Sequence, residues 1–431
     1  MRRRDLLTAS AALAATPALA TRATADAPDA PSGKGTPGPR ARVRTGFERL
    51  RASGYASLAG QRVGVISNPT GVDADLGHIV DAMAADGKVD LVAVFGPEHG
   101  FRGTSQAGQG EDFFTDAKTG LPVYNAYNSS TTMAGYFAEL NLDTVVFDIQ
   151  EIGARFYTYI WTMYLALEAA AELGLRFVVL DRPNVLSARD AHGPVLYPEN
   201  STFVGLKPIA QQYGMTVGEL AGLFNDTFVP ETTGGKRADL HVERMAGWKR
   251  RMRYAQTGLP WVPPSPNMPT VATAEAYVGT CYFEASALSE GRGTTMPFQL
   301  LGAPGVDHRW QEALNGLGLP GVRFREAYFT PTFSKWSGKS CGGVELQITD
   351  HDRFDPIRTA LTMIKEQRRL FPAHGWRSQD GGSNYWLDKL SGDRRVRLAV
   401  EAGAPVDDIV ALWQDDLAAF RTRRARHLLY S

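Results

Sequence analysis

The chain has 431 residues, and its 46 Lys and Arg balance its 46 Asp and Glu. A composition of 43% hydrophobic and 21% charged residues is typical of a folded globular protein, and the length allows two domains. The even charge balance argues against a nucleic-acid partner or attraction to an anionic membrane. After residue 25 no uncharged apolar stretch is long enough to cross a bilayer, so we expect no transmembrane helix in the mature protein.

The first twenty residues have the pattern of an export signal. Arg2-Arg3-Arg4 precedes an apolar stretch that ends in Ala18-Leu19-Ala20, a small-residue cleavage pattern. Arg3-Arg4-Asp5-Leu6-Leu7 resembles a twin-arginine motif, and the alternative is an ordinary secretory signal. We expect residues 1–20 to be removed on export to the periplasm or the exterior. Residues 21–42, rich in Ala, Pro, Gly, Thr and Ser, are expected to be a disordered linker.

The two cysteines, Cys281 and Cys341, are not spaced as metal ligands. The chain lacks the His-Glu-x-x-His and Cys-x-x-Cys patterns of zinc sites. Its Gly-x-Gly-x-x-Gly pattern at 33–38 lies in the predicted linker, without a strand before it or a helix after it. We therefore expect neither a metal nor a nucleotide cofactor. Since twin-arginine passengers fold in a reducing compartment, we expect two buried free thiols.

Residues 62–182 alternate strand-like and helix-like segments. This rhythm predicts an α/β fold with a parallel sheet and right-handed crossovers. The predicted strands are 62–67, 91–95, 144–148 and 177–181, and the predicted helices are 76–85, 131–140 and 160–173.

A proline-rich segment at 261–269 is expected to be a rigid extended loop at a domain junction, because proline cannot donate to a helix or a central strand. It separates a catalytic domain at 43–265 from a smaller α+β domain at 266–431. In the second domain we expect strands at 322–324 and 343–349 and helices at 356–370 and 406–429.

Acidic side chains follow three of the predicted strands. Parallel strands share one carboxyl edge, where open α/β sheets bind their ligands. Glu98, Asp148, Glu151 and Asp181 are therefore expected to converge at one edge of the sheet.

The strongest candidate is Gly96-Pro97-Glu98-His99-Gly100, which carries one acid and one imidazole directly after a strand. A carboxylic acid in a partly dry cleft can act as a general acid. Arg102 lies in the same loop and is a candidate for substrate binding. The alternative interpretation is a turn acid that accepts hydrogen bonds from backbone amides.

A second candidate segment, 148–159, follows the next strand with Asp148, Glu151, Arg155 and Tyr157. Aromatic faces beside carboxylates suit a sugar ring, and an arginine can hold a substrate carboxylate by two hydrogen bonds. The alternative is an ion pair of Arg155 with Asp148 or Glu151 that only orders the loop.

A third candidate segment, 289–295, places Glu290 and Arg292 between glycines that allow close approach of a ligand. A surface turn with an exposed ion pair is the alternative. Three neutral groups in proline-fixed loops are weaker candidates for substrate binding, and structural turn roles suit them equally: Asn184, Ser265 and Asn267.

Five motifs spread over nearly the whole mature chain are informative together. They are Gly-Pro-Glu-His-Gly at 96–100, Phe-Asp-Ile-Gln at 147–150, Gly-Ala-Arg-Phe-Tyr-Thr-Tyr at 153–159, Leu-Asp-Arg-Pro-Asn at 180–184 and Ser-Glu-Gly-Arg-Gly-Thr-Thr at 289–295. As a set they resemble the exo-β-N-acetylmuramidases of the NamZ type. The resemblance implies a Rossmann-like N-terminal domain, a smaller C-terminal domain and an active site in the cleft between them. It also implies release of N-acetylmuramic acid from the non-reducing end of peptidoglycan fragments, with Glu98 as the catalytic glutamate.

On this basis we expect an exported glycoside hydrolase acting on muramyl saccharides. Glu98 is expected to protonate the glycosidic oxygen, and His99 to orient Glu98 or a substrate hydroxyl. Asp148 is expected to supply the second carboxyl function, by activating water, acting as nucleophile or orienting the 2-acetamido group. Arg155 or Arg292 is expected to bind the lactyl carboxylate.

Two other functions remain compatible with the residues. One is a non-catalytic cell-wall protein that binds sugar in the same cleft. The other is a serine esterase that uses Ser105 with His99, although the chain has no Gly-x-Ser-x-Gly motif.

Overall fold

The computed structural model describes residues 42–127, 129–378 and 380–431. The predicted signal at 1–20 and, except for Arg42, the predicted linker at 21–42 lie outside the described residues.

A seven-stranded sheet has the order β3-β4-β2-β1-β5-β6-β9, and every neighbouring pair is parallel except β3 with β4. This confirms the predicted α/β class, and the four predicted strands lie within one residue of their observed ends. The strands are β1 (Arg62–Ser67), β2 (Asp90–Gly96), β3 (Phe114–Thr115), β4 (Pro122–Asn125), β5 (Thr144–Asp148), β6 (Arg176–Leu180) and β9 (Asp239–Glu243).

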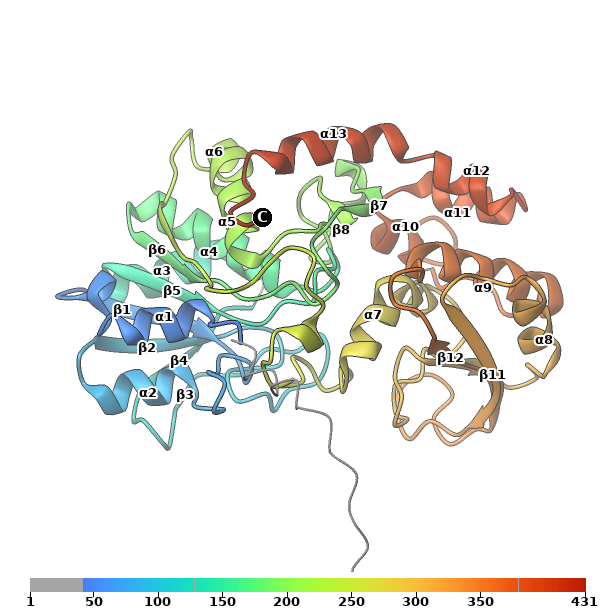
Figure 1. Ribbon diagram of the computed structural model, residues 1–431, viewed down its shortest axis with the longest axis horizontal. Coiled ribbons are helices and arrows are strands. Elements are labelled where there is room, and N and C mark those ends of the chain that lie inside the picture. The colour runs from blue at the N-terminus through green and yellow to red at the C-terminus, as the bar shows by residue number, and fades with distance from the viewer. Residues whose placement is uncertain (1–41, 128, 379) are drawn as a thin grey trace, which may run out of the picture. The chain divides into compact units, whose positions relative to one another are not determined.

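Apolar side chains alternate between the two faces of this sheet, so each face buries its own core. Val65 and Val146 pack with residues of α1 and α2, whereas their neighbours Ile66 and Phe147 pack with residues of α3, α4 and α5. Figure 1 shows the helices surrounding the strands. The helices are α1 (Gly46–Ala52), α2 (Ile79–Asp86), α3 (Ser130–Glu139), α4 (Tyr159–Leu173), α5 (Val217–Leu223) and α6 (Val229–Thr232).

A capping box begins α5. The hydroxyl of Thr216 accepts from the Glu219 amide at 3.2 Å, and the Glu219 carboxylate accepts from the Thr216 amide at 3.0 Å.

The C-terminal part contains a smaller antiparallel sheet of order β10-β12-β11 and confirms the predicted α+β class. The predicted helix at 356–370 is observed with those bounds as α9 (Pro356–Leu370). The other elements are α7 (Val271–Thr280), β10 (Leu300–Ala303), α8 (Arg309–Gly316), β11 (Val322–Phe329), β12 (Cys341–Ile348), α10 (Trp386–Ser391) and α11 (Arg394–Glu401). The predicted boundary at 265/266 stays a prediction, but residues 261–269 form no helix or strand, as expected.

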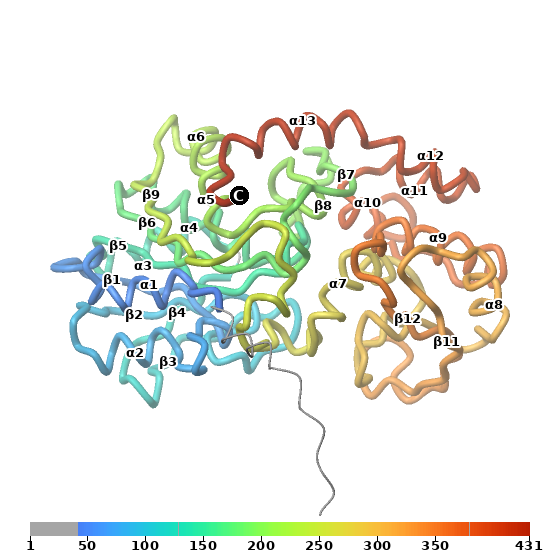
Figure 2. Tube along the Cα trace, viewed as in Figure 1, coloured from blue at the N-terminus to red at the C-terminus, as the bar shows by residue number. Residues whose placement is uncertain are grey.

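The predicted helix at 406–429 is wrong in its extent. The chain forms α12 (Val406–Ala411) and α13 (Gln414–Ala425), separated at Trp413. Trp413 leaves helical geometry with φ −115° and ψ 5°, and its side chain is buried in the core. Figure 2 shows α13 running back toward α5, where the amide of Leu429 donates to Glu219 Oε1 at 2.7 Å.

Cys281 and Cys341 are both free and buried, as expected. Within the described ranges, no helix combines the length and the apolar character needed to cross a membrane.

Candidate active site

A cavity of about 620 Å³ opens where the loops after β2 and β5 meet segments of the C-terminal part. Seven of the residues selected from the sequence line it: Glu98, His99, Tyr157, Ser265, Asn267, Glu290 and Arg292. Its volume lies in the usual range for small-molecule sites. We therefore treat this cavity as the candidate active site.

The loop after β2 is shaped by glycines that leave room for the side chain of Glu111. A Cβ on Gly96 would lie 2.0 Å from Glu111 Oε1, and Gly100 has a left-handed φ of +81°. Glu111 Oε1 accepts from the amide of Phe101 at 2.6 Å, and burial raises the pKa of Glu111. This packing fixes the turn that presents Glu98 to the cavity.

Glu98 is held only by uncharged donors. Its Oε1 accepts from the Gly108 amide at 2.7 Å, and its Oε2 accepts from the hydroxyl of Thr158. Among the described residues, no cation lies within ion-pair distance of it. The other two carboxylates of the cavity differ, because Arg292 lies 2.7 Å from Glu284 and 3.3 Å from Glu290.

His99 adopts a left-handed φ of 72° and lines the cavity beside Glu98. Its Nδ1 lies 3.0 Å from the carbonyl oxygen of Ser105, and burial lowers its pKa, which favours the neutral imidazole. The Ser105 hydroxyl donates instead to the Gly110 carbonyl at 3.1 Å. The esterase alternative is therefore corrected, because the imidazole faces the carbonyl of Ser105 and not its hydroxyl.

Aromatic rings form one wall of the cavity. The ring of Tyr157 meets Tyr159 edge to face at 5.3 Å and Tyr277 at 5.8 Å, and Tyr277 meets Phe298 at 4.6 Å. Burial raises the pKa of the three tyrosines well above the ordinary value, so their hydroxyls stay neutral. Such a wall suits the apolar face of a sugar ring.

Two cationic side chains, Arg292 and Lys335, also line the cavity. Burial disfavours the charged form of Arg292, but Glu284 and Glu290 outweigh this and hold its pKa above the ordinary value. Its Nε and Nη2 contact these carboxylates, whereas Nη1 makes no hydrogen bond within the described residues. Lys335 Nζ lies 2.7 Å from Glu290 and donates to backbone carbonyls, including that of Leu288 at 2.6 Å.

Asn267 carries an unsatisfied polar group in the cavity. It is 5% exposed, lines the cavity, and its Nδ2 has no hydrogen-bond partner among the described residues. A buried amide donor without a partner is costly, so this group is suited to a substrate oxygen.

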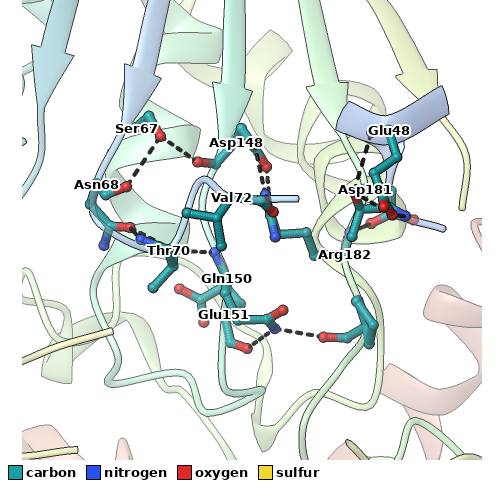
Figure 3. A network of polar contacts seen from close by, with 12 residues as sticks. Glu48, Ser67, Asn68, Thr70, Val72, Asp148, Gln150, Glu151, Asp181 and Arg182 are labelled. Carbon is teal, nitrogen blue, oxygen red and sulfur yellow. Dashed lines mark hydrogen bonds and ion pairs between the residues drawn. The ribbon is translucent and has the colours of Figure 1, made fainter. Parts of the chain in front are cut away.

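Asp148 does not line the cavity, and its expected role as the second catalytic carboxyl is corrected. Its side chain is fully buried and accepts two hydrogen bonds from Arg182, from Nε and, at 2.9 Å, from Nη2. Arg182 also donates to the carbonyl of Val72 at 2.9 Å. Figure 3 shows this ion pair among the strand ends. A buried carboxylate that neutralises a buried guanidinium has a structural role.

The same network explains why the crevice at the centre of the sheet is closed. The strand order reverses between β1 and β5, where such folds commonly bind ligands. There the Ser67 hydroxyl donates to the Asp148 carbonyl at 2.9 Å, and the Thr70 hydroxyl accepts from the Gln150 amide at 2.8 Å (Figure 3). The cavity left beside Thr70 and Gln150 measures only about 10 Å³. The candidate active site is instead the larger cavity, which is lined by the loops that follow β2 and β5.

Arg155 is also corrected, because it cannot reach a substrate in the cavity. It is fully buried and donates to the carbonyls of Pro194 at 3.0 Å, Ile209 at 3.1 Å and Leu390 at 2.7 Å. Burial without a carboxylate partner lowers its pKa to about 10. Because Leu390 lines the cavity, Arg155 positions the cavity wall that α10 supplies.

Glu151 and Asp181 are buried carboxyls that do not line the cavity, so their assignment to substrate binding is corrected. Glu151 Oε2 accepts from the hydroxyl of Tyr213 at 3.1 Å, and burial raises the pKa of Glu151 to about 8. Asp181 accepts from the hydroxyls of Tyr430 at 2.5 Å and Thr216 at 2.8 Å, and burial raises its pKa to about 7.

Arg102 and Asn184 likewise serve the fold, and their assignment to substrate binding is corrected. Arg102 pairs with Asp81 at 2.9 Å and with Asp116 at 2.8 Å, away from the cavity lining. The side-chain amide of Asn184 donates to the Met215 carbonyl at 2.7 Å.

Several lining residues were not selected from the sequence. Thr158 donates a hydrogen bond to Glu98. Glu284 forms an ion pair with Arg292, and Lys335 forms one with Glu290. Arg377 and Trp386 line the cavity from the C-terminal part. Only Thr158 lay in a motif that the sequence analysis used. The others reach the cavity through tertiary packing and carry no local signal. Within the described ranges, no cluster of three or more His, Cys, Asp and Glu is placed to hold a metal ion.

A cavity with an aromatic wall, a carboxyl free of cations and a set of ion pairs suits a charged sugar, and this chemistry points to the glycosidases. Family models support this independently. The model of the N-terminal part of the exo-β-N-acetylmuramidase NamZ family matches residues 63–272, and the model of its C-terminal part matches 275–430. The chain therefore belongs to the exo-β-N-acetylmuramidase NamZ family and is a glycosidase.

Individual relatives are consistent with this family assignment. The chain is 44% identical over 401 residues to the peptidoglycan β-N-acetylmuramidase NamZ of Bacillus subtilis (strain 168), covering 93% of this chain and 94% of that protein. Crystal structures of two DUF1343 family proteins from Bacteroides fragilis NCTC 9343 are similar. One has a TM-score of 0.82 at 35% identity and covers 91% of this chain and 100% of its own. The other has a TM-score of 0.71 at 28% identity and covers 91% and 99%.

Proposed function

We propose that this glycosidase releases N-acetylmuramic acid from the non-reducing end of peptidoglycan fragments, with Glu98 as its general acid. The single observation that carries the assignment of Glu98 is its set of partners. Of the three carboxylates lining the cavity, Glu98 alone is held by an amide and a hydroxyl, while Glu284 and Glu290 are ion-paired. The name of the Bacillus subtilis relative supports the substrate.

The neutral partners matter because a general acid must hold a proton and then release it. An ion-paired carboxylate resists protonation, since protonation would break the pair. Glu98 loses no ion pair when it is protonated. It can therefore give its proton to the glycosidic oxygen as the bond to the anomeric carbon breaks.

Asp148 cannot serve as the nucleophile or as the base that activates water, because its carboxylate is buried and paired with Arg182. Glu284 and Glu290 are engaged with Arg292 and Lys335. We therefore propose that the 2-acetamido oxygen of the substrate attacks the anomeric carbon while Glu98 protonates the leaving oxygen. Water then opens the cyclic intermediate, and Glu98 accepts the proton from that water.

This mechanism has a direct chemical test. A substrate whose acetamido group carries electron-withdrawing fluorines should react progressively more slowly as fluorines are added, because its carbonyl oxygen becomes a weaker nucleophile. A covalent adduct of the sugar with Glu284 or Glu290, trapped by a fluorinated glycoside and located by mass spectrometry, would contradict it.

We further propose that Arg292 binds the lactyl carboxylate that distinguishes muramic acid from glucosamine. Its Nη1 is available, and its charge is fixed by two carboxylates on its other side. Asn267 offers an amide donor in the same cavity.

The primary experiment is a product assay. The purified protein should release N-acetylmuramic acid from a disaccharide of N-acetylmuramic acid β-linked to N-acetylglucosamine, as followed by chromatography. Glu98→Gln should bind the disaccharide without releasing product. Release by this variant at the wild-type rate would remove Glu98 from the mechanism.

Export by the twin-arginine route is proposed from residues 2–20 of the sequence. Replacing Arg3 and Arg4 together by lysine should leave the protein in the cytoplasm of a bacterial host, whereas the wild type appears outside it. Unchanged export of the double variant would favour the general secretory route.

A further inference from the structure

A second cavity, of about 300 Å³, lies apart from the candidate active site. It is formed by residues 186–192, the end of β8 (Ala210–Gln212), residues 251–253 and the segment that leads into α9. Its lining shares no residue with that of the larger cavity. Nothing in the mechanism above uses it.

Gln212 is a mostly buried residue whose amide group is open to this cavity. Gln212 is only 8% exposed, lines the cavity, and makes no side-chain hydrogen bond to any described residue. Its neighbour Gln211 behaves differently, because it donates to the Val278 carbonyl at 2.7 Å and accepts from the hydroxyl of Tyr282. Side chains alternate along a strand, so the two glutamines face opposite sides of β8. One is satisfied by the fold, and the other is left for a ligand.

The carboxylates of this cavity are already occupied. Glu275 lies 2.6 Å from His351 and 3.6 Å from Arg253, and Asp352 lies 2.6 Å from Arg253. These contacts leave no acid here that requires a cation from outside.

The remaining two acids are also engaged. Asp190 pairs with Arg421 at 2.6 Å and with Arg424 at 3.3 Å. Asp355 caps α9, where it accepts from the amides of Ile357 at 3.1 Å and Arg358 at 3.0 Å.

Two arginines of the lining have no such partner. Arg251 and Arg353 line the cavity, and within the described residues neither makes an ion pair or a side-chain hydrogen bond. The lining therefore holds two free guanidinium groups and one free amide. Planar guanidinium groups bind carboxylates by paired hydrogen bonds, and an amide N–H supplies a further donor.

We propose that this cavity binds a small molecule through its carboxylate, with Gln212 donating from the buried end and Arg251 and Arg353 supplying the charge. The volume suits a ligand the size of a short dicarboxylic acid or an acylated amino acid. A free acid and the carboxyl end of a peptide present the same group. The test therefore uses one probe of each kind, glutarate and N-acetylalanine, together with inorganic phosphate.

The experiment is isothermal titration of the purified full-length protein with each of the three probes. Saturable binding of glutarate or N-acetylalanine is expected, weakened at least tenfold by Arg353→Ala and abolished by Gln212→Glu, which places a like charge at the buried end. Binding of glutarate alone would identify a free acid, and binding of N-acetylalanine alone would identify a peptide end. Arg426→Ala, an exposed arginine outside the lining, is the matched control and should leave binding unchanged.

Three results would overturn the proposal: no saturable binding of either carboxylate, binding of phosphate alone, or equal weakening by Arg353→Ala and Arg426→Ala. Thermal denaturation checks that each variant is folded, and Arg353→Ala, at an exposed position, keeps the test decisive if Gln212→Glu does not fold. Because binding is measured without turnover, the result is independent of the proposed glycosidase mechanism.

Discussion

The hydroxyl of Thr158 donates a hydrogen bond to Oε2 of Glu98 and so joins two loops that follow different strands of the sheet. Glu98 follows β2 and Thr158 follows β5, and β1 lies between these strands. Thr158 also stands at the N-terminus of α4, whose residues are almost all buried. The orientation of the proposed general acid is therefore set by a rigid helix of the core.

Replacing Thr158 by valine should remove this donor while keeping the shape of the side chain. Loss of one hydrogen bond to a charged or reacting group costs about 1.5–3 kcal/mol, so we expect kcat to fall roughly 10-fold to 100-fold. KM should change little, because Thr158 holds Glu98 rather than the sugar. Steady-state kinetics on the natural disaccharide measure both, because its sugar leaving group needs the general acid. Thr158→Ser retains the hydroxyl and should recover most of the activity; an unchanged kcat in the valine variant would contradict this role.

Asp148→Asn should affect stability rather than chemistry. Removing one member of a buried ion pair leaves Arg182 uncompensated, which costs about 3–5 kcal/mol. We expect a lower midpoint of thermal unfolding, with the activity of the remaining folded protein close to that of the wild type. A variant that keeps its thermal midpoint but loses turnover would return Asp148 to the mechanism.

Arg292→Ala should discriminate between sugars. If Arg292 binds the lactyl carboxylate, the loss in kcat/KM should be at least tenfold larger for an N-acetylmuramide than for the matching N-acetylglucosaminide. Kinetics on the two chromogenic glycosides give the comparison. Arg102→Ala is a useful control, because Arg102 pairs with Asp81 and Asp116 outside the cavity. Equal losses on both sugars would reject the carboxylate contact.

The buried carboxyl of Glu151 predicts a pH dependence of stability. Burial raises its pKa from 4.5 to about 8, so the folded state holds this proton at pH values where the unfolded chain has lost it. Its contribution to stability is therefore complete below about pH 4.5 and is lost as the pH rises toward 8. Denaturant unfolding across this range should show the loss, and Glu151→Gln should flatten the curve. An identical slope in the variant would show that Glu151 does not titrate there.

The regular elements were the most predictable part of the fold. The strand at 62–67 and the helix at 356–370 were predicted with their observed bounds, because apolar periodicity and a proline at the first helical position mark them locally. The position of Glu98 was also predictable, since an acid in a glycine-framed turn after a strand reaches the carboxyl edge whatever the neighbouring strands are.

The partners of the other acids were not predictable. Asp148 follows its strand just as a catalytic acid would, and only the tertiary placement of Arg182 shows that it is structural. Arg155 was expected to bind a carboxylate, but it is bound by three backbone carbonyls, one of them 235 residues away in the chain at Leu390. Every residue has a backbone carbonyl, so the sequence does not indicate which of them will accept a hydrogen bond from an arginine.

The basic residues near the C-terminus show the same dependence on tertiary structure. Arg421 and Arg424 both pair with Asp190, and Arg424 is buried. Lys335 reaches the cavity from a loop of unusual backbone geometry. Its loop holds Ser334 and Trp336 at left-handed φ values of 67° and 60°, a strained conformation that only the folded chain enforces.

The most direct test of the account compares leaving groups in Glu98→Gln. A general acid is needed when the leaving oxygen is a sugar alkoxide, but hardly at all when it is dinitrophenolate. We predict that the variant loses nearly all release of N-acetylmuramic acid from the natural disaccharide but still releases the first equivalent of dinitrophenolate rapidly, because only the later attack of water needs Glu98 as a base. Equal slowing of the first bond-breaking step on both substrates would show that Glu98 is not the proton donor.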